Sequence, residues 1–168
     1  LALANGGAVH VGATYNKPLT TLGTLATADL NPDPIISDAI HHVDLLRWLA
    51  GAEEDRAAIP VAVHSEVQDG ERAGAHRQNA TIRFDTGAIG VMTSHYGVGH
   101  RIQRAELHAE DLSAYLEMTR KPHVELYAAT EQKDGTTEGK QVRSGLDLKA
   151  VGGAKFNEPV HFVDCILN

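Results

Sequence analysis

The spacing of apolar residues changes along the chain, and it predicts a helix early in the sequence followed by a run of strands. Residues 36–50 carry apolar side chains at helical spacing and end at Gly51, which is typical of a helix terminus. After Pro60 the period changes to two, so that residues 61–67 alternate between the two faces of a strand. The helix over 36–50 is the most clearly marked element of the sequence.

Short apolar or alternating runs, separated by turn residues, predict the remaining strands. Asp85-Thr86-Gly87 and Glu110-Asp111-Leu112 each have the form of a hairpin turn. The predicted strands cover residues 8–15, 61–67, 79–84, 88–96, 101–109, 113–118 and 123–129. A polar loop is expected over 130–140, and a helix is expected to open at 157. Consecutive hairpins with few helices predict an α+β fold, an open and mostly antiparallel sheet whose helices cover one face.

Composition narrows the classes of partner. The 168-residue chain has a net charge of −7, from 15 Lys+Arg against 22 Asp+Glu. This balance argues against nucleic acid or an anionic membrane surface as the main partner. No apolar run approaches the roughly 20 residues that cross a bilayer. Cys165 is the single cysteine of the sequence, which excludes a disulfide framework and favours the cytoplasm.

The glycine-rich stretches do not match a nucleotide-binding turn. Gly97-Val98-Gly99 lacks a third glycine and leads into a predicted strand, and Asn5-Gly6-Gly7 also precedes one. A dinucleotide site requires a strand, a glycine turn and then a helix. We therefore expect no cofactor-binding residue and no bound NAD or NADP in this chain alone. The single cysteine and the scattered histidines likewise predict no metal site.

The polar side of the helix over 36–50 carries the candidate chemistry. Asp38 and Asp44 each lie three residues from His41, so both are helical neighbours of this imidazole. An imidazole between two carboxylates is suited to general acid–base work on an alcohol or carbonyl. His42 is a competitor because it lies four residues from Asp38. The alternative is a helix whose polar face forms ordinary surface pairs, and spacing by itself favours that alternative.

The helical stretch also resembles a family. Ser37-Asp-Ala-Ile-His41-His-Val-Asp44-Leu-Leu-Arg-Trp-Leu-Ala-Gly51 is similar to a hallmark of the Gfo/Idh/MocA oxidoreductases, the glucose–fructose oxidoreductase and inositol dehydrogenase family. In their second domain a helix of pattern Asp-x-x-x-His-x-x-Asp is followed by a Leu-Arg-Trp-Leu-like run and Gly. The stretches 80–90, 106–116 and 159–166 resemble later elements of the same domain, in the same order.

The resemblance implies a two-domain NAD(P)-dependent enzyme acting on a sugar, polyol or related hydroxy compound. Residues 1–168 would be its C-terminal substrate-binding and oligomerisation domain, cut at both ends, with the last helix truncated and the Rossmann domain and catalytic lysine outside the chain. The family pattern places His41 at the catalytic position and Asp44 at a substrate contact. Its first acid falls on Ser37, one residue before Asp38, and either residue can take that role.

These implications define what we expect of the protein. The full-length enzyme would oxidise its substrate with NAD or NADP, using His41 with Asp38 as catalytic residues, while this chain alone would be inactive. Its partners would be a small sugar-type molecule and further copies of itself, bound through the open sheet face. The alternatives are a non-catalytic sugar-binding or assembly domain of the same fold and a standalone metal- or sugar-binding module.

Overall fold

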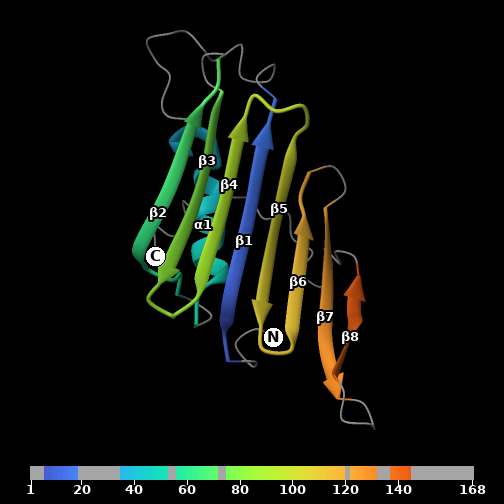
Figure 1. Cartoon of the computed structure of the whole chain (residues 1–168). Coiled ribbons are helices and arrows are strands. Elements are labelled where there is room, and N and C mark those ends of the chain that lie inside the picture. The colour runs from blue at the N-terminus through green and yellow to red at the C-terminus, as the bar shows by residue number, and fades with distance from the viewer. Residues whose placement is uncertain are drawn as a thin grey trace, which may run out of the picture.

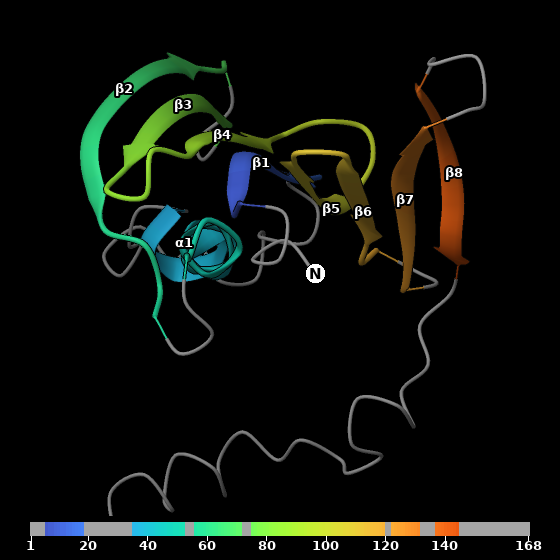
Figure 2. The same cartoon turned by 90° about the horizontal axis from the view of Figure 1, so that it is seen from below.

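The computed structural model describes residues 6–18, 35–52, 56–71, 75–119, 122–131 and 137–144. Its strands form one open eight-stranded sheet in the order β2-β3-β4-β1-β5-β6-β7-β8 (Figure 1). The strands are β1 (Ala8–Lys17), β2 (Pro60–Asp69), β3 (His76–Phe84), β4 (Ile89–Tyr96), β5 (Ile102–Ala109), β6 (Leu112–Glu117), β7 (His123–Glu131) and β8 (Thr137–Ser144). Helix α1 (Ile40–Leu49) packs against one face of the sheet (Figure 2).

Strand β1 lies between β4 and β5, parallel to β4 and antiparallel to β5. All other neighbouring strands are antiparallel, as the hairpin pattern predicts. Because β1 separates β4 from β5, the connection 97–101 passes over the carboxyl end of β1 (Figure 1). Gly97, at φ 81°, fixes this crossing by donating its N–H to the Lys17 carbonyl at 2.9 Å.

The predicted helix is confirmed, with a modified first turn. A π-helical turn, η3 (Ile35–Ala39), runs directly into α1. Leu46 and Ala39 are fully buried against the sheet. The largest fully buried side chains are Tyr96, Phe84, Leu46, Val11 and Ser94, and all of the strand residues among them lie in β1, β3 and β4. The core therefore sits between α1 and the middle of the sheet.

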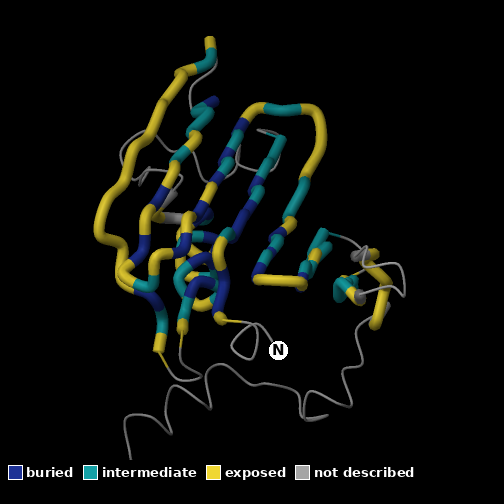
Figure 3. Tube along the Cα trace, turned by 60° about the horizontal axis from the view of Figure 1, so that its bottom comes forward, coloured by how far each residue is buried: buried dark blue, intermediate teal, exposed yellow. Residues whose placement is uncertain are grey.

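Alternation along the strands separates the helix-covered face from the open face. On β1, Val11, Ala13 and Tyr15 are buried, whereas Thr14 between them is only partly buried on the other side. Burial falls away from the centre of the sheet, and β2 is exposed along its whole length (Figure 3). Among the described elements, no helix covers the open face (Figure 2).

Most predicted strands are confirmed to within a few residues, and both predicted hairpin turns form. Gly87 in the first turn and Asp111 in the second have positive φ, at 88° and 55°. The prediction of a loop over 130–140 is wrong at both ends, because β7 continues to Glu131 and β8 begins at Thr137. The side chains of β8 are mostly polar, and its strand form comes from backbone pairing with β7. The helix expected from 157 lies outside the described residues.

In the described part of the chain, no helix has the length and hydropathy needed to cross a bilayer.

Candidate functional site

Asp38, in the π-helical turn, is held by two side chains from the end of β1. The Tyr15 hydroxyl donates to Asp38 Oδ1 and the Lys17 ammonium to Asp38 Oδ2, both at 2.6 Å. Tyr15 and Lys17 are two residues apart on a strand, so both point to the helix-covered face. The Lys17 and Asp38 side chains are only 14% and 23% exposed, which makes this a partly buried ion pair.

The charges of this cluster are set by its hydrogen bonds. Burial by itself would raise the pKa of Asp38, but the bonds from Lys17 and Tyr15 outweigh it and lower that pKa overall. Burial, followed by the bond to the Asp38 carboxylate, raises the pKa of Tyr15 far above neutrality. At neutral pH, Asp38 is therefore an anion and Tyr15 a neutral donor.

His42 is buried beside this cluster. Its ring centroid lies 4.5 Å from that of Tyr15, and the residue is only 5% exposed. Neither ring nitrogen has a hydrogen-bond partner among the described residues. Burial, with smaller contributions from nearby charges, lowers the pKa of His42 to about 4, so the ring is neutral at pH 7.

His41 lies on the exposed side of α1, beside a shallow hollow of about 350 Å³ lined by Ile40, His41, Val43, Asp44 and Arg47. Asp44 accepts a hydrogen bond from Arg47 at 3.1 Å. Within the described residues, neither Asp38 nor Asp44 forms a hydrogen bond or ion pair with His41. The two carboxylates expected around His41 are therefore engaged elsewhere, and its catalytic role stays a prediction. The side chain of Ser37 lies outside the description.

Sequence reasoning did not find Tyr15, Lys17 or Arg101. The alternation of β1 places the first two on one face, but nothing local shows that this face meets the start of the helix. Arg101 directly precedes β5, whose Ile102 lies opposite Asn16 of β1. The positive charge of Arg101 lies close enough to help lower the pKa values of Asp38 and His42. The same charge reduces the rise in the pKa of Tyr15.

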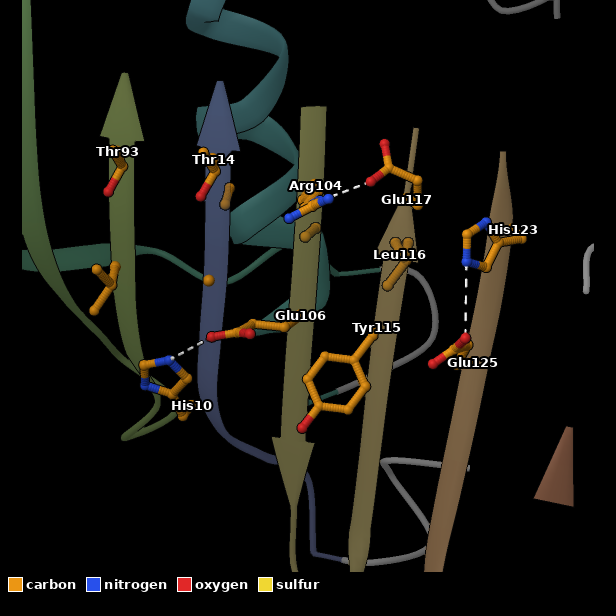
Figure 4. A pocket seen from close by; sticks show the side chains of 14 residues that line it. His10, Thr14, Thr93, Arg104, Glu106, Tyr115, Leu116, Glu117, His123 and Glu125 are labelled. Carbon is orange, nitrogen blue, oxygen red and sulfur yellow. Dashed lines mark hydrogen bonds and ion pairs between the residues drawn. The ribbon is translucent and has the colours of Figure 1, made fainter. Parts of the chain in front are cut away.

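A larger groove than the one beside His41 lies on the open sheet face (Figure 4). It has a volume of about 660 Å³ and is lined by His10, Gly12, Ala13, Thr14, Val91, Thr93, Arg104, Ala105, Glu106, Tyr115, Leu116, Glu117, His123 and Glu125. Three pairs of basic and acidic side chains face each other in the groove. They are His10–Glu106, Arg104–Glu117 and His123–Glu125, with N···O separations of 3.6, 2.6 and 3.8 Å. The two pairs with histidine are ion pairs only when the imidazole is protonated.

Polar contacts hold the side chains of this groove in place. Hydrogen bonds from Thr119 and then Arg104 lower the pKa of Glu117 to about 2. Glu106 lies across β1 towards His10 because Gly12 has no side chain there (Figure 4). A Cβ at Gly12 would come within 2.8 Å of the Glu106 Cγ. Charged and polar side chains therefore share the lining of the groove with apolar ones such as Val91 and Leu116.

The described residues do not fit a dinucleotide cofactor. Gly6 and Gly7 lead into β1, and Gly97 and Gly99 lead into β5, as expected from the sequence. Neither turn opens a helix, whose N-terminal amides would bind the pyrophosphate. A group of three or more His, Cys, Asp or Glu side chains able to hold a metal ion is also absent from the described part of the chain.

Comparison with solved structures identifies the fold. UDP-N-acetylglucosamine 3-dehydrogenase GnnA from Acidithiobacillus ferrooxidans matches with a TM-score of 0.60 and 18% identity, over 85% of this chain and 41% of that one. Levoglucosan dehydrogenase in complex with NADH and L-sorbose matches with a TM-score of 0.56 and 18% identity, over 83% of this chain and 40% of that one. The dehydrogenase MviM from Clostridium difficile matches with a TM-score of 0.54 and 16% identity, over 96% and 47%.

The chain shares its fold with Gfo/Idh/MocA-type dehydrogenases. The resemblance seen in the sequence is thus confirmed at the level of fold. No protein-family model matches the sequence, and no curated protein matches it significantly. The chain spans about two fifths of the length of the GnnA and levoglucosan dehydrogenase structures, at 41% and 40%.

Proposed function

We propose that residues 1–168 form the C-terminal substrate-binding domain of a longer NAD(P)-dependent dehydrogenase that acts on a hydroxyl group of a sugar or polyol. The observation that carries this proposal is the shared fold, which extends over 85% of the chain with one sugar-nucleotide dehydrogenase and 83% with levoglucosan dehydrogenase. Because the described residues do not fit the dinucleotide, we propose that another part of the longer protein binds it.

In this proposal His41 handles the proton of the substrate hydroxyl. Its ring is exposed on the first turn of α1, so a substrate can reach it without a change in the helix. Imidazole is the side chain best suited to exchanging protons near neutral pH. Asp38, one helical turn away, is the acid partner of His41 in this proposal, and Tyr15 and Lys17 hold its carboxylate in place. Asp44, held by Arg47, is an acceptor for a second substrate hydroxyl.

The test uses the full-length gene product and a panel of sugars and polyols with NAD and NADP. His41→Ala should lower kcat by about 10²–10⁴-fold, the usual contribution of a general acid–base group. His42→Phe retains a buried aromatic ring and should change kcat little. Equal losses in both variants, or full turnover in His41→Ala, would show that the assignment is wrong.

We also propose that the longer protein self-associates through the open sheet face. The groove of Figure 4 offers apolar surface and pairs of oppositely charged side chains such as Arg104–Glu117, and the proposed interface uses both. Tyr115, 41% exposed in the groove, supplies the aromatic contact surface that such interfaces favour.

The second candidate function is a non-catalytic sugar-binding or assembly domain of the same fold. It is favoured by one observation, that His41 lacks a bonded carboxylate among the described residues. Saturable sugar binding by the full-length protein, without reduction of NAD or NADP by any of the panel, would support this candidate.

A further inference from the structure

Two cationic side chains converge at the carboxyl end of β1. Lys17 is the last residue of β1, and the crossing connection 97–101 ends with Arg101 at the start of β5. Asn16 lies opposite Ile102 in the antiparallel pair, so the same register brings Arg101 beside Lys17. The hydrogen bond from Gly97 to the Lys17 carbonyl, at 2.9 Å, holds the crossing connection onto the strand end.

One carboxylate faces these two cations. Asp38 is occupied by Lys17 and Tyr15 through both of its oxygens. Arg101 is exposed, and it forms no salt bridge with any carboxylate in the part of the chain that the structure describes. Tyr15 and His42 are neutral there, so the cluster retains one excess positive charge within a chain of net charge −7.

We propose that Arg101 binds an anionic group, a carboxylate or a phosphate, carried by the sugar-type substrate. This inference rests on the proposed function, which supplies the sugar as the ligand. The planar guanidinium matches both kinds of oxyanion through paired hydrogen bonds. Lys17 is a positioning residue, because it neutralises Asp38 and so removes the repulsion that a lone carboxylate would exert on an incoming anion.

The position of the cluster explains how such an anchor would serve the reaction. Asp38 lies one helical turn before His41, so the anion site borders the exposed first turn of α1. A substrate held by its charged end at Arg101 would extend over this turn. Its reacting hydroxyl would then lie at His41, with orientation fixed by the two separate contacts.

The test measures binding to the full-length protein by isothermal titration at low salt, without turnover. The probes are glucose and galactose, their uronic acids and their 6-phosphates. We expect an anionic member to bind about tenfold or more tightly than its neutral parent, as a charged hydrogen bond implies. If the uronic acid binds more tightly than the 6-phosphate, the anion that Arg101 recognises is a carboxylate; if the 6-phosphate binds more tightly, it is a phosphate. Arg101→Gln should remove this preference, and Arg83→Gln, an exposed arginine on β3, should retain it.

Equal binding of charged and neutral sugars, no binding by any probe, or a preference that survives Arg101→Gln would overturn the proposal. These outcomes are separable from failure of the proposed function. Charge-selective binding without dehydrogenase activity would refute the enzyme and leave the anion site intact. Oxidation of neutral sugars unaffected by Arg101→Gln would refute the anion site alone.

Discussion

The Tyr15 hydroxyl donates a 2.6 Å hydrogen bond to Asp38, joining the end of the central strand β1 to the turn that opens the helix. Lys17 completes this link from the same strand face. The position of the candidate catalytic helix relative to the sheet is therefore fixed by an ion pair and a phenol, in addition to the apolar core.

Removal of the Asp38 charge should destabilise the fold. Asp38→Asn leaves the partly buried Lys17 ammonium without its counter-ion, and we expect the free energy of unfolding to fall by about 1–3 kcal/mol. Asp44→Asn is the matched control, because its pair with Arg47 is exposed and should contribute less than about 0.5 kcal/mol. Urea denaturation measures both values. Similar losses in the two variants would contradict the role given to the Asp38 cluster.

The buried His42 should make the fold sensitive to mild acid. Its folded pKa of about 4 lies below the ordinary value of 6.5, so the unfolded chain takes up the proton first as the pH falls. The contribution to stability is thus complete above pH 6.5 and is lost progressively towards pH 4, by up to about 3 kcal/mol.

His42→Phe removes the protonation of this side chain. The urea midpoint of the variant should therefore differ less between pH 7 and pH 4 than that of the wild-type protein. His64→Gln alters an exposed ring on β2 and should leave the acid sensitivity of the protein unchanged. A steep fall that persists in His42→Phe would assign the acid sensitivity to other groups.

Two glycines of the central sheet should differ in their tolerance of alanine. A Cβ at Gly90 would lie 2.7 Å from a ring carbon of the buried Phe84, so Gly90→Ala should cost about 1–3 kcal/mol through overpacking. A Cβ at Gly12 meets the flexible Glu106 side chain on the open face, so Gly12→Ala should cost less than about 1 kcal/mol. The thermal unfolding midpoints of the two variants test this order of stability costs. A larger fall in midpoint for Gly12→Ala than for Gly90→Ala would contradict the prediction.

Self-association through the open face should be sensitive to charge within the groove. Thr93→Arg places an unpaired cation there and should weaken association of the full-length protein at least about tenfold, measured by light scattering over a concentration series. Ser65→Arg, on β2, has its side chain on the opposite face and should leave the oligomer unchanged. A wild-type protein that is monomeric at high concentration would remove the basis of the proposal.

The sequence by itself determined the helix and most strands of this protein. Apolar periodicity marked residues 36–50 and the alternating strands, and turn residues such as Gly87 marked the hairpins, because these signals act between neighbours in the chain. Strand β8 escaped prediction because its form depends on pairing with β7 rather than on its own polar residues.

Only the tertiary structure decided which side chains meet at the candidate site. In the sequence His41 and His42 are both helical neighbours of Asp38, yet packing of α1 on β1 buries His42 beside Tyr15 and leaves His41 exposed. The partners of Asp38 lie 23 and 21 residues away, on a strand whose parallel pairing with β4 has no local signal. Contacts of this kind depend on how elements pack, so helical spacing alone does not reveal that Tyr15 and Lys17 bond Asp38.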